Sequence, residues 1–388
     1  MFVTELSLMD FRNYTLATVS LSPGVNVFVG SNGQGKTNLV EAVEYLSTMS
    51  SHRVAATAPL IRSGCESAIL RATVQAAADD PRLMTVELEV ANGRSNVARL
   101  NRSPLSRPRD LIGALRTVVF SPVDLAIVRG DPSDRRAWLD SLVVTRWPRM
   151  AGVRQDFDRV LKQRNALLKS MGSRQGRTDG DDDVTLQVWN EQFATFGAEL
   201  LHARLDTLAD VLPHVQQAYE TIAPVNNRVA ATYKTPLDLA GVAEAGDVRA
   251  ALTHRLLQAM EARRAEEVQR GVTLVGPQRD DIDLAIGDLP AKGYASHGES
   301  WSLALALRLG GFALVRNDGT EPVLVLDDVF AELDTSRRER LAGAISDAEQ
   351  VLITAAVGAD VPDFPSQRRF WVRAGTVEQD VQPTEVTA

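Results

Sequence analysis

The sequence predicts an α/β fold of mixed sheets and helices with an inserted α-helical arm. Strand-like and helix-like patterns alternate over residues 1–120 and return from about residue 271, whereas the segment between them is helix-rich and charged. A glycine-rich loop at residues 30–37 joins an apolar run to a helical pattern. A second apolar run, residues 323–328, ends in two carboxylates, which is typical of a buried parallel strand with a polar site at its end.

Composition narrows the class of protein before any motif is considered. The chain of 388 residues has room for two or three domains, and 44% hydrophobic with 24% charged residues is typical of a globular protein. The net charge of −8 gives no global basic footprint for nucleic acid. No apolar run reaches membrane-spanning length, the charged N-terminal stretch does not fit a signal peptide, and the single cysteine, Cys65, cannot form an internal disulfide. We therefore expect a cytoplasmic protein.

Two strand patterns lead to the glycine-rich loop. Residues 2–8 alternate apolar and polar, a second pattern covers residues 16–21, and a Pro-Gly turn directs the chain into the strand that feeds the loop. A helix with an apolar stripe is expected at residues 36–49. The loop fits G-x-x-x-x-G-K-[ST] and is followed by Asn38; its residues are Gly30, Ser31, Asn32, Gly33, Gln34, Gly35, Lys36 and Thr37.

This loop is predicted to hold the phosphates of a nucleotide. Its glycines let backbone N–H groups turn inward, which a Cβ would obstruct. The following helix N-terminus adds partial positive charge, and Lys36 would reach the β- and γ-phosphates. The Thr37 hydroxyl suits Mg²⁺, a hard cation that prefers oxygen ligands. A chance glycine-rich turn is the alternative, and the strand–loop–helix context argues against it.

An arginine-rich segment, residues 94–109, lies among further strands expected at 68–74, 83–90 and 117–120. Only Asp110 is near it in the sequence as a counter-charge. The segment either contacts a phosphate backbone, where arginines displace counterions, or forms a solvated hairpin. Both interpretations fit the sequence equally well.

A helical arm is expected after Pro122. Helical patterns cover residues 134–169 and 189–208 and predict two antiparallel helices, each spanning roughly 45 Å at about 1.5 Å per residue. An exposed turn is expected at 171–183. Its acidic run could bind a metal, but a solvated loop explains the run better. Pro213 and Pro224 are expected to interrupt the return, and another helix is expected at 248–270. Basic residues along the arm either meet DNA or form a charged helix surface; they are Arg154, Arg159, Lys162, Arg164, Lys169, Arg174 and Arg177.

Two later features complete the predicted site. Asp327 ends the apolar run and would hold Mg²⁺ beside Thr37, and Asp328 could orient or activate water at the γ-phosphate. Ser296 stands at the N-cap position of a helical pattern at 303–314, and Gly298 permits close backbone approach. A helix N-terminus with a free hydroxyl is a second phosphate-binding device, which one nucleotide does not need from the same subunit. We therefore expect Ser296 to serve a nucleotide held by another copy of the chain.

These residues carry a family resemblance over essentially the whole chain. The sequence resembles the ATP-binding-cassette (ABC) ATPases related to SMC proteins, and within them the RecF family of bacterial recombination mediators and gap-repair proteins. The resemblance rests on an ordered set of motifs: Phe11-Arg12-Asn13-Tyr14, the loop at 30–37, Ser51-His52-Arg53, Ser121-Pro122-Val123-Asp124-Leu125, Arg135-Arg136-Ala137-Trp138-Leu139-Asp140, Gly276-Pro277-Gln278-Arg279-Asp280-Asp281, the Ser296 segment, and Leu326-Asp327-Asp328-Val329-Phe330-Ala331-Glu332-Leu333-Asp334.

The resemblance implies a role for each matched position. Lys36 and Thr37 would bind phosphates and Mg²⁺, with Arg12 and Asn13 lining the nucleotide site. Ser296, Gly298 and Glu299 would form the signature that contacts ATP across a dimer. Asp327 would be the metal carboxylate and Asp328 the hydrolytic one. Asp334 would lie at the dimer interface, and Thr354, after a strand at 350–353, near the switch position.

Several positions depart from the family pattern. Asp328 stands where most ABC ATPases have glutamate, although aspartate is usual in RecF-like proteins, and its shorter side chain fits slow turnover. Ser300-Trp301 replaces a basic residue that some relatives carry after the signature. Gln278 replaces a histidine, and no histidine follows Thr354.

The resemblance implies an ABC-type P-loop ATPase head with an inserted arm, which dimerises on ATP and hydrolyses it slowly. The head would comprise residues 1–120 and 271–388, with a disordered tail from about 378, and the arm residues 121–270. The implied target is duplex DNA near single-strand gaps, and the implied partners are RecR and RecO, which help to load RecA. The alternatives are another SMC-like ATPase acting on DNA ends, which the short arm argues against, an ATP-glued DNA-binding module without turnover, and, more remotely, a transporter subunit.

Overall fold

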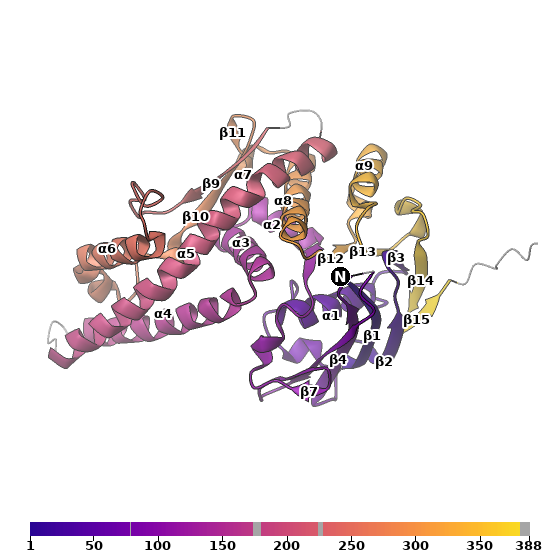
Figure 1. The fold of residues 1–388 in the computed structure, drawn as a ribbon, viewed down its shortest axis with the longest axis horizontal. Helices are drawn as coiled ribbons and strands as arrows, with labels where there is room; N and C mark the ends of the chain where they lie inside the picture. The colour runs from indigo at the N-terminus through magenta and orange to yellow at the C-terminus, as the bar shows by residue number, and fades with distance from the viewer. Residues whose placement is uncertain (78, 174–179, 224–227, 381–388) are drawn as a thin grey trace, which may run out of the picture. The chain divides into compact units, whose positions relative to one another are not determined.

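The computed structural model describes residues 1–77, 79–173, 180–223 and 228–380 of the chain (Figure 1). These described residues divide into two compact units. The sequence-based boundaries near 120 and 270 would assign residues 213–229 to the arm and residues 271–294 to the head, whereas the compact units group these two segments the other way. Unit 1 comprises Met1–Val128, Pro213–Val229 and Ala295–Ala388, and unit 2 comprises Arg129–Leu212 and Ala230–Tyr294.

One sheet of unit 1 is antiparallel and has the strand order β2-β1-β4-β5-β6-β7. In β1, Leu6 and Leu8 are buried while Glu5 and Met9 are exposed, because successive side chains of a strand point to opposite faces. The strands predicted at 2–8, 16–21, 68–74 and 83–90 are confirmed as β1, β2, β4 and β5, and the arginine-rich segment adds β6 and β7. Their bounds are β1 (Phe2–Phe11), β2 (Tyr14–Ser20), β4 (Ser67–Gln75), β5 (Leu83–Ala91), β6 (Val97–Leu100) and β7 (Ser103–Pro104).

The other sheet of unit 1 has the order β15-β14-β3-β13-β12-β8 and is parallel except for β15. Every residue of β12 is buried, as its apolar run predicts for a strand covered on both faces. The carboxyl ends of β3, β13 and β12 meet at one edge of this sheet, where a ligand site is expected in an open α/β fold. The bounds are β3 (Gly24–Val29), β8 (Thr117–Phe120), β12 (Val323–Asp327), β13 (Gln350–Ala355), β14 (Arg368–Arg373) and β15 (Thr376–Gln379).

Helix α1 (Lys36–Thr48) lies between these two sheets and contacts strands of both. Leu39, Val43 and Leu46 are at most 1% exposed and join one continuous core with both sheets. The remaining helices of unit 1 are α2 (Leu125–Arg129), α8 (His297–Asn317) and α9 (Thr335–Ile345), together with the C-terminal part of α5 (Gly180–Ile222).

Unit 2 is built mainly from helices that run alongside one another (Figure 1). Phe157 of α4 packs on Phe193 of α5 with ring centroids 5.0 Å apart, and Arg164 Nε donates to Asn190 Oδ1 at 2.8 Å. Later residues of α4 thus meet earlier residues of α5, which confirms the antiparallel packing; the first helix, expected over residues 134–169, is divided into α3 and α4 by a break at residues 147–149 that contains Pro148. The elements are α3 (Pro132–Arg146), α4 (Met150–Ser173), the N-terminal part of α5, α6 (Val248–Arg270), α7 (Ala291–Tyr294), and a sheet of β11 (Leu289–Pro290), β10 (Asp281–Ile286) and β9 (Val229–Lys234).

Some predictions for the arm and the tail are wrong. Pro213 lies inside α5 and does not end it; the buried neighbours Val211 and Val215 offset the cost of a proline by tertiary packing. The predicted turn at 171–183 is helical at 171–173 and 180–183, and its remaining residues, like Pro224, lie outside the described part of the chain. The tail predicted from residue 378 begins within β15, and residues 381–388 are likewise not described.

The arginine-rich segment forms a hairpin whose counter-charges come largely from β5. Arg94 pairs with Glu89 at 2.8 Å and Arg99 with Glu87 at 2.7 Å. These carboxylates come from the neighbouring strand β5. The sequence next to the arginines shows only Asp110 and therefore does not reveal them.

In the part of the chain that the structure describes, none of the helices has the length and apolar composition of a membrane span.

A buried ion pair ties the helices of unit 2 together. Arg164 on α4 is 1% exposed, and its Nη2 donates to Glu267 Oε2 on α6 at 2.6 Å. Glu267, which is 0% exposed, also accepts the backbone N–H of Leu274 at 2.7 Å. Arg164 is therefore a structural residue of unit 2, unavailable to DNA.

We predict that Glu267→Ala lowers the free energy of unfolding by about 3–5 kcal/mol, because it leaves the Arg164 guanidinium buried without its anionic partner. Urea unfolding followed by circular dichroism measures the change. Glu266→Ala is the matched control, since Glu266 forms only exposed pairs with Arg263 and Arg270 and should leave the unfolding curve nearly unchanged. Equal curves for both variants would contradict the structural role of the pair.

Candidate nucleotide site

The glycine-rich loop is held in shape by contacts that leave no room for side chains at two of its glycines. A Cβ on Gly30 would lie 2.3 Å from the backbone oxygen of Val372. Gly35 has φ +114°, and a Cβ there would lie 2.7 Å from Asn13 Nδ2. Tyr14 Oη donates to the backbone oxygen of Gly35 at 3.0 Å. A side chain at Gly30 or Gly35 would therefore disturb the shape of the loop.

Polar side chains brace the same loop from both flanks. Asn13 Nδ2 donates to the Gln34 backbone oxygen at 3.0 Å, and Asn38 Nδ2 donates to Asn13 Oδ1 at 2.7 Å. Gln34 Oε1 accepts the N–H of Ala374 at 2.7 Å, and Lys36 Nζ donates to the Ser31 oxygen at 3.2 Å. Asn32 and Gly33 lie exposed at the tip of the loop.

The carboxyl ends of β12 and β13 bring Asp327 and Thr354 to the start of α1. Asp327 Oδ1 accepts from Thr37 Oγ1 at 2.9 Å and from Thr354 Oγ1 at 2.6 Å. Thr354 lies within β13 as the register partner of Asp327, so the prediction that it follows the strand is wrong by two residues. Asp327, at the end of β12, is thus joined to the start of α1 next to the glycine-rich loop. Its position beside Thr37 is as predicted.

Asp328 faces the same region in a strained backbone conformation. Its φ is +55°, and its N–H donates to Thr354 Oγ1 at 2.9 Å. Its Oδ1 is buried without a hydrogen-bond partner. Burial raises the pKa of Asp328, although the charge of Lys36 opposes the rise. Burial also lowers the pKa of Lys36, against the charges of Asp328 and Asp327. Lysine and aspartates thus form a compact, partly buried charge cluster.

The donor set fits a hard divalent cation bound with a phosphate. Thr37 and Asp327 offer hydroxyl and carboxylate oxygens, which Mg²⁺ prefers, and the loop beside them presents backbone N–H groups and an ammonium. Among the described residues, no group of three or more His, Cys, Asp or Glu is arranged as a self-contained metal site. The other ligands of a metal held by Thr37 and Asp327 would be phosphate oxygens and water.

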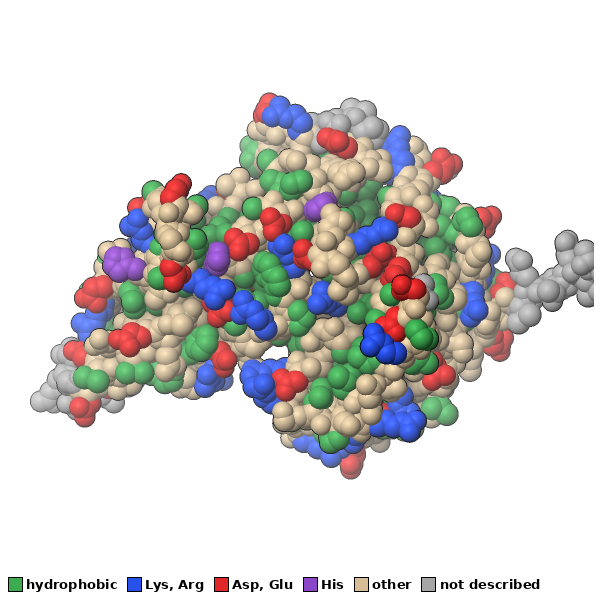
Figure 2. Space-filling view, viewed as in Figure 1, with side chains coloured by type: hydrophobic (Ala, Val, Ile, Leu, Met, Phe, Trp, Pro, Cys, Tyr) green, Lys and Arg blue, Asp and Glu red, His purple; other side chains and the backbone are tan. Residues whose placement is uncertain are grey.

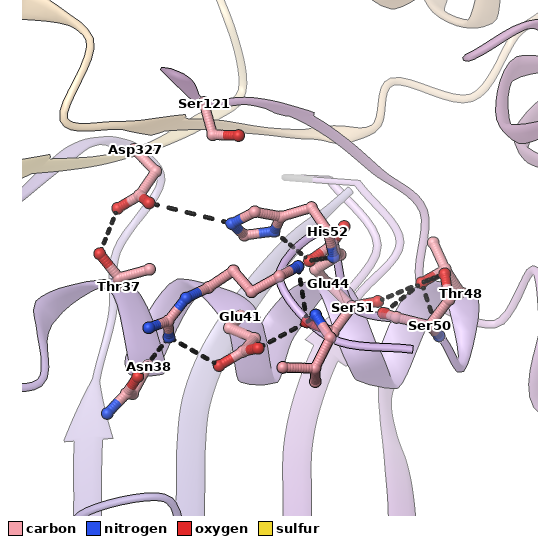
Figure 3. A network of polar contacts seen from close by, with 12 residues as sticks. Thr37, Asn38, Glu41, Glu44, Thr48, Ser50, Ser51, His52, Ser121 and Asp327 are labelled. Atoms are coloured by element: carbon pink, nitrogen blue, oxygen red, sulfur yellow. Dashed lines mark hydrogen bonds and ion pairs between the residues drawn. The ribbon is translucent and has the colours of Figure 1, made fainter. Parts of the chain in front are cut away.

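A network around the buried carboxylate of Glu41 extends from the loop along α1 (Figure 3). Glu41 is 0% exposed and accepts from Arg12 Nε at 2.8 Å and Arg53 Nη1 at 3.2 Å. Arg53 Nη1 also donates to Asn38 Oδ1 at 2.7 Å. Burial raises the pKa of Glu41, but hydrogen bonds from Arg12 and Ser51 outweigh it, and its pKa lies below the ordinary value. Arg12 is thus placed beside the loop by a residue of α1.

His52 comes from the loop after α1 and reaches the acidic strand. Its Nδ1 lies 2.6 Å from Glu44 Oε2, and its Nε2 lies 4.0 Å from Asp327 Oδ2 (Figure 3). Burial lowers the pKa of His52, but the hydrogen bond and charge of Glu44 outweigh it, so its pKa is raised.

The predicted signature residues form a second group at the N-termini of α8 and α9. Ser296 is the N-cap of α8, as predicted: its Oγ accepts the Glu299 N–H at 3.2 Å, and Glu299 Oε2 accepts the Ser296 N–H at 2.8 Å. Asp334 caps α9 by accepting the Arg337 N–H at 2.9 Å. A Cβ on Gly298 would lie 2.9 Å from Arg337 Nη1, so this glycine makes space for a guanidinium.

Two departures from the family pattern have structural explanations. Trp301 is 2% exposed and makes an edge contact with Phe120, with centroids 5.1 Å apart, so this position belongs to the core. Gln278 Nε2 donates to the Val275 oxygen at 2.8 Å and supports a turn in unit 2.

Sequence reasoning missed the roles of Glu41, Glu44 and Arg337. The carboxylates look like an ordinary polar face of a helix, and only their i, i+3 spacing hints that they act together. Arg337 stands three residues after Asp334 and gives no motif signal.

The parallel sheet with its glycine-rich loop, the acidic strand end and the capped helix α8 define the class, an ABC-type ATPase head of the SMC kind. The family "RecF/RecN/SMC N terminal domain" matches residues 2–361. The fold is also that of the Smc head domain from Pyrococcus furiosus, with a TM-score of 0.53, 14% identity and coverage of 98% of this chain and 96% of that one.

Closer relatives identify the branch. The chain is 59% identical over 386 residues to the DNA replication and repair protein RecF of Cutibacterium acnes, covering 97% of this chain and 98% of the relative. It is similar to a solved structure of the recombination mediator protein RecF-ATP in the RecFOR pathway, with a TM-score of 0.86, 26% identity and coverage of 98% of both chains. The chain belongs to the RecF family of DNA replication and repair proteins.

Proposed function

We propose that this chain binds ATP with Mg²⁺ at the glycine-rich loop. Lys36 contacts the β- and γ-phosphates, and Thr37 and Asp327 hold the metal. Arg12 and Asn13 line the nucleotide site. The loop residues that contact the nucleotide are Gly30, Asn32, Gly33, Gln34, Gly35, Lys36, Thr37 and Asn38. When bound, Mg²⁺ neutralises phosphate charge during hydrolysis.

One observation carries this proposal. The hydroxyls of Thr37 and Thr354 share a single oxygen of Asp327, which fixes that carboxylate beside a loop shaped by its glycines. Hard oxygen donors next to backbone N–H groups and Lys36 match the chemistry of a metal-bound triphosphate. The similarity to a solved RecF-ATP structure supports the same ligand.

We infer further that two copies complete each site. Ser296, Gly298 and Glu299 sit at a capped helix N-terminus, a device that binds anionic groups. One copy would hold ATP on its loop, and the partner copy would offer this signature to the γ-phosphate, with Asp334 at the interface. The contact exists only in the closed dimer, so loss of the γ-phosphate favours opening.

Asp328 is the proposed hydrolytic carboxylate. Its unpaired, buried Oδ1 can accept a hydrogen bond from water, and Thr354 holds its backbone N–H. We propose slow, DNA-stimulated turnover, so that the ATP-bound dimer is long-lived and hydrolysis acts as a timer.

The proposed target is duplex DNA near single-strand gaps, with RecR and RecO as partners that help load RecA in the cytoplasm. Family membership and the RecFOR pathway of the structural relative support this role. Acidic and basic side chains are interspersed on the face drawn in Figure 2, and the net charge is −8, so DNA contact would use a limited surface. In this proposal unit 1 forms the ATPase head and unit 2 forms the arm.

We predict that Lys36→Ala abolishes ATP binding, whereas Ser296→Ala leaves binding intact and prevents dimerisation. The first variant removes a phosphate contact within one copy, and the second removes one between copies. Equilibrium binding of a fluorescent ATP analogue and size-exclusion chromatography with light scattering, with and without gapped duplex DNA, separate the two effects. An ATP-dependent dimer of the Ser296 variant like that of the wild type would refute the shared site.

We predict that Asp328→Asn gives ATP-bound dimers that persist, because an amide cannot take the proton of the attacking water. Phosphate release and the dimer lifetime after ATP is diluted are the two measurements. Turnover at the wild-type rate would remove Asp328 from the hydrolytic role.

A further inference from the structure

The segment Ser51–Arg53 is clamped onto α1 by two buried carboxylates. Glu41 accepts from Ser51 Oγ at 2.6 Å as well as from Arg53. Glu44, three residues later on α1, accepts from the backbone N–H of His52 at 3.3 Å and from its Nδ1 at 2.6 Å. Side chains three residues apart on a helix lie on one face, so the two carboxylates hold the segment at successive points. The imidazole of His52 is thereby fixed on both its backbone and its ring.

The fixed ring presents its other nitrogen to the proposed metal carboxylate. A carboxylate only accepts hydrogen bonds, so Nδ1 carries the hydrogen toward Glu44, and Nε2 is the atom that faces Asp327. The Nε2–Oδ2 distance is 4.0 Å, and both side chains are less than 10% exposed. Oδ1 of Asp327 already accepts from Thr37 and Thr354. Oδ2 is therefore the oxygen left for the metal and its water, and His52 stands next to it.

We propose that His52 is a positioning residue for the Mg²⁺ site and acts through Asp327, with Glu44 orienting the imidazole. This inference rests on the proposed function, because it assigns a further residue to the same site. Mg²⁺ prefers oxygen ligands, so His52 serves Asp327 Oδ2 or a water held by the metal and does not bind the metal itself. Partners of this kind orient ligating groups and commonly change metal affinity by about 10- to 100-fold.

The network beyond His52 supports a role tied to the nucleotide. Glu41, which binds Ser51, also binds Arg12 and Arg53. Arg53 donates to Asn38, Asn38 donates to Asn13, and Asn13 donates to the Gln34 backbone oxygen. These hydrogen bonds end at Ser51 and Arg53, the two residues that flank His52, so they join the proposed nucleotide-lining residues to the segment that carries the ring. The sequence has no histidine after Thr354, and His52 brings one to this site from a distant part of the chain.

The test is a Mg²⁺ titration of ATP-dependent dimerisation, made with a non-hydrolysable ATP analogue so that turnover plays no part. We expect His52→Ala to raise the Mg²⁺ concentration at half-maximal dimer by about 10-fold. Binding of the analogue in EDTA should stay at the wild-type level. Glu44→Ala should shift the midpoint in the same direction, and the double variant should shift it no further than His52→Ala, since both act through one ring.

Controls separate positioning from folding. His202→Ala changes a half-buried histidine of α5 that pairs with Asp206, and it should leave the midpoint unchanged. His52→Gln keeps a donor and an acceptor and should fall between wild type and His52→Ala, even where the alanine variant is less stable.

Two results would overturn the inference alone. The first is an unchanged Mg²⁺ midpoint in both His52 variants while dimerisation of the wild type depends on Mg²⁺. The second is a midpoint shift in the Glu44 and His52 double variant that equals the sum of the two single shifts. A wild-type chain that binds the analogue without any Mg²⁺ dependence would instead overturn the proposed metal site, and this inference with it.

Discussion

A single carboxylate oxygen connects the two parts of the candidate site. Asp327 Oδ1 accepts hydrogen bonds from Thr37, at the start of α1, and from Thr354, on the neighbouring strand β13. The parallel pairing of β3, β13 and β12 brings these residues to one edge, so chain segments some 300 positions apart meet there. The Thr354 hydroxyl at this junction also accepts the backbone N–H of Asp328, so the same contacts fix the neighbouring carboxylate.

Helix α1 serves the core and the site with different faces. Its apolar side chains pack between the two sheets, while Glu41 and Glu44 bind the side chains of Arg12, Ser51 and His52. Buried charges of this kind add little net stability, because desolvation offsets most of their attraction. Their value here is geometric: they fix Arg12 and the segment that carries His52. The candidate site is thus organised by its second layer of residues as much as by the loop itself.

The sequence predicts the parts of this structure that depend on local pattern. The glycine-rich loop, the buried strand ending at Asp327 and the Ser296 cap each have a fixed spacing with a physical cause, and each is found as predicted. Long-range contacts decided the features that were missed. Packing around Pro213 keeps α5 continuous, β5 supplies carboxylates to the arginine hairpin, and Glu44 turns His52 toward Asp327. The first two leave no periodic or motif signal; the Ser51-His52-Arg53 motif marks the third segment in the sequence, but only the fold shows that His52 faces Asp327.

Mixing two defective chains shows whether the loop of one copy and the signature of another form one site. Lys36→Ala retains an intact signature, and Ser296→Ala retains an intact loop. If the site is shared, neither variant dimerises alone with ATP, yet their mixture forms a heterodimer with one complete site, detectable by light scattering and by energy transfer between labels. If each copy completes its own site, the mixture stays monomeric, and a site shared between two copies is excluded.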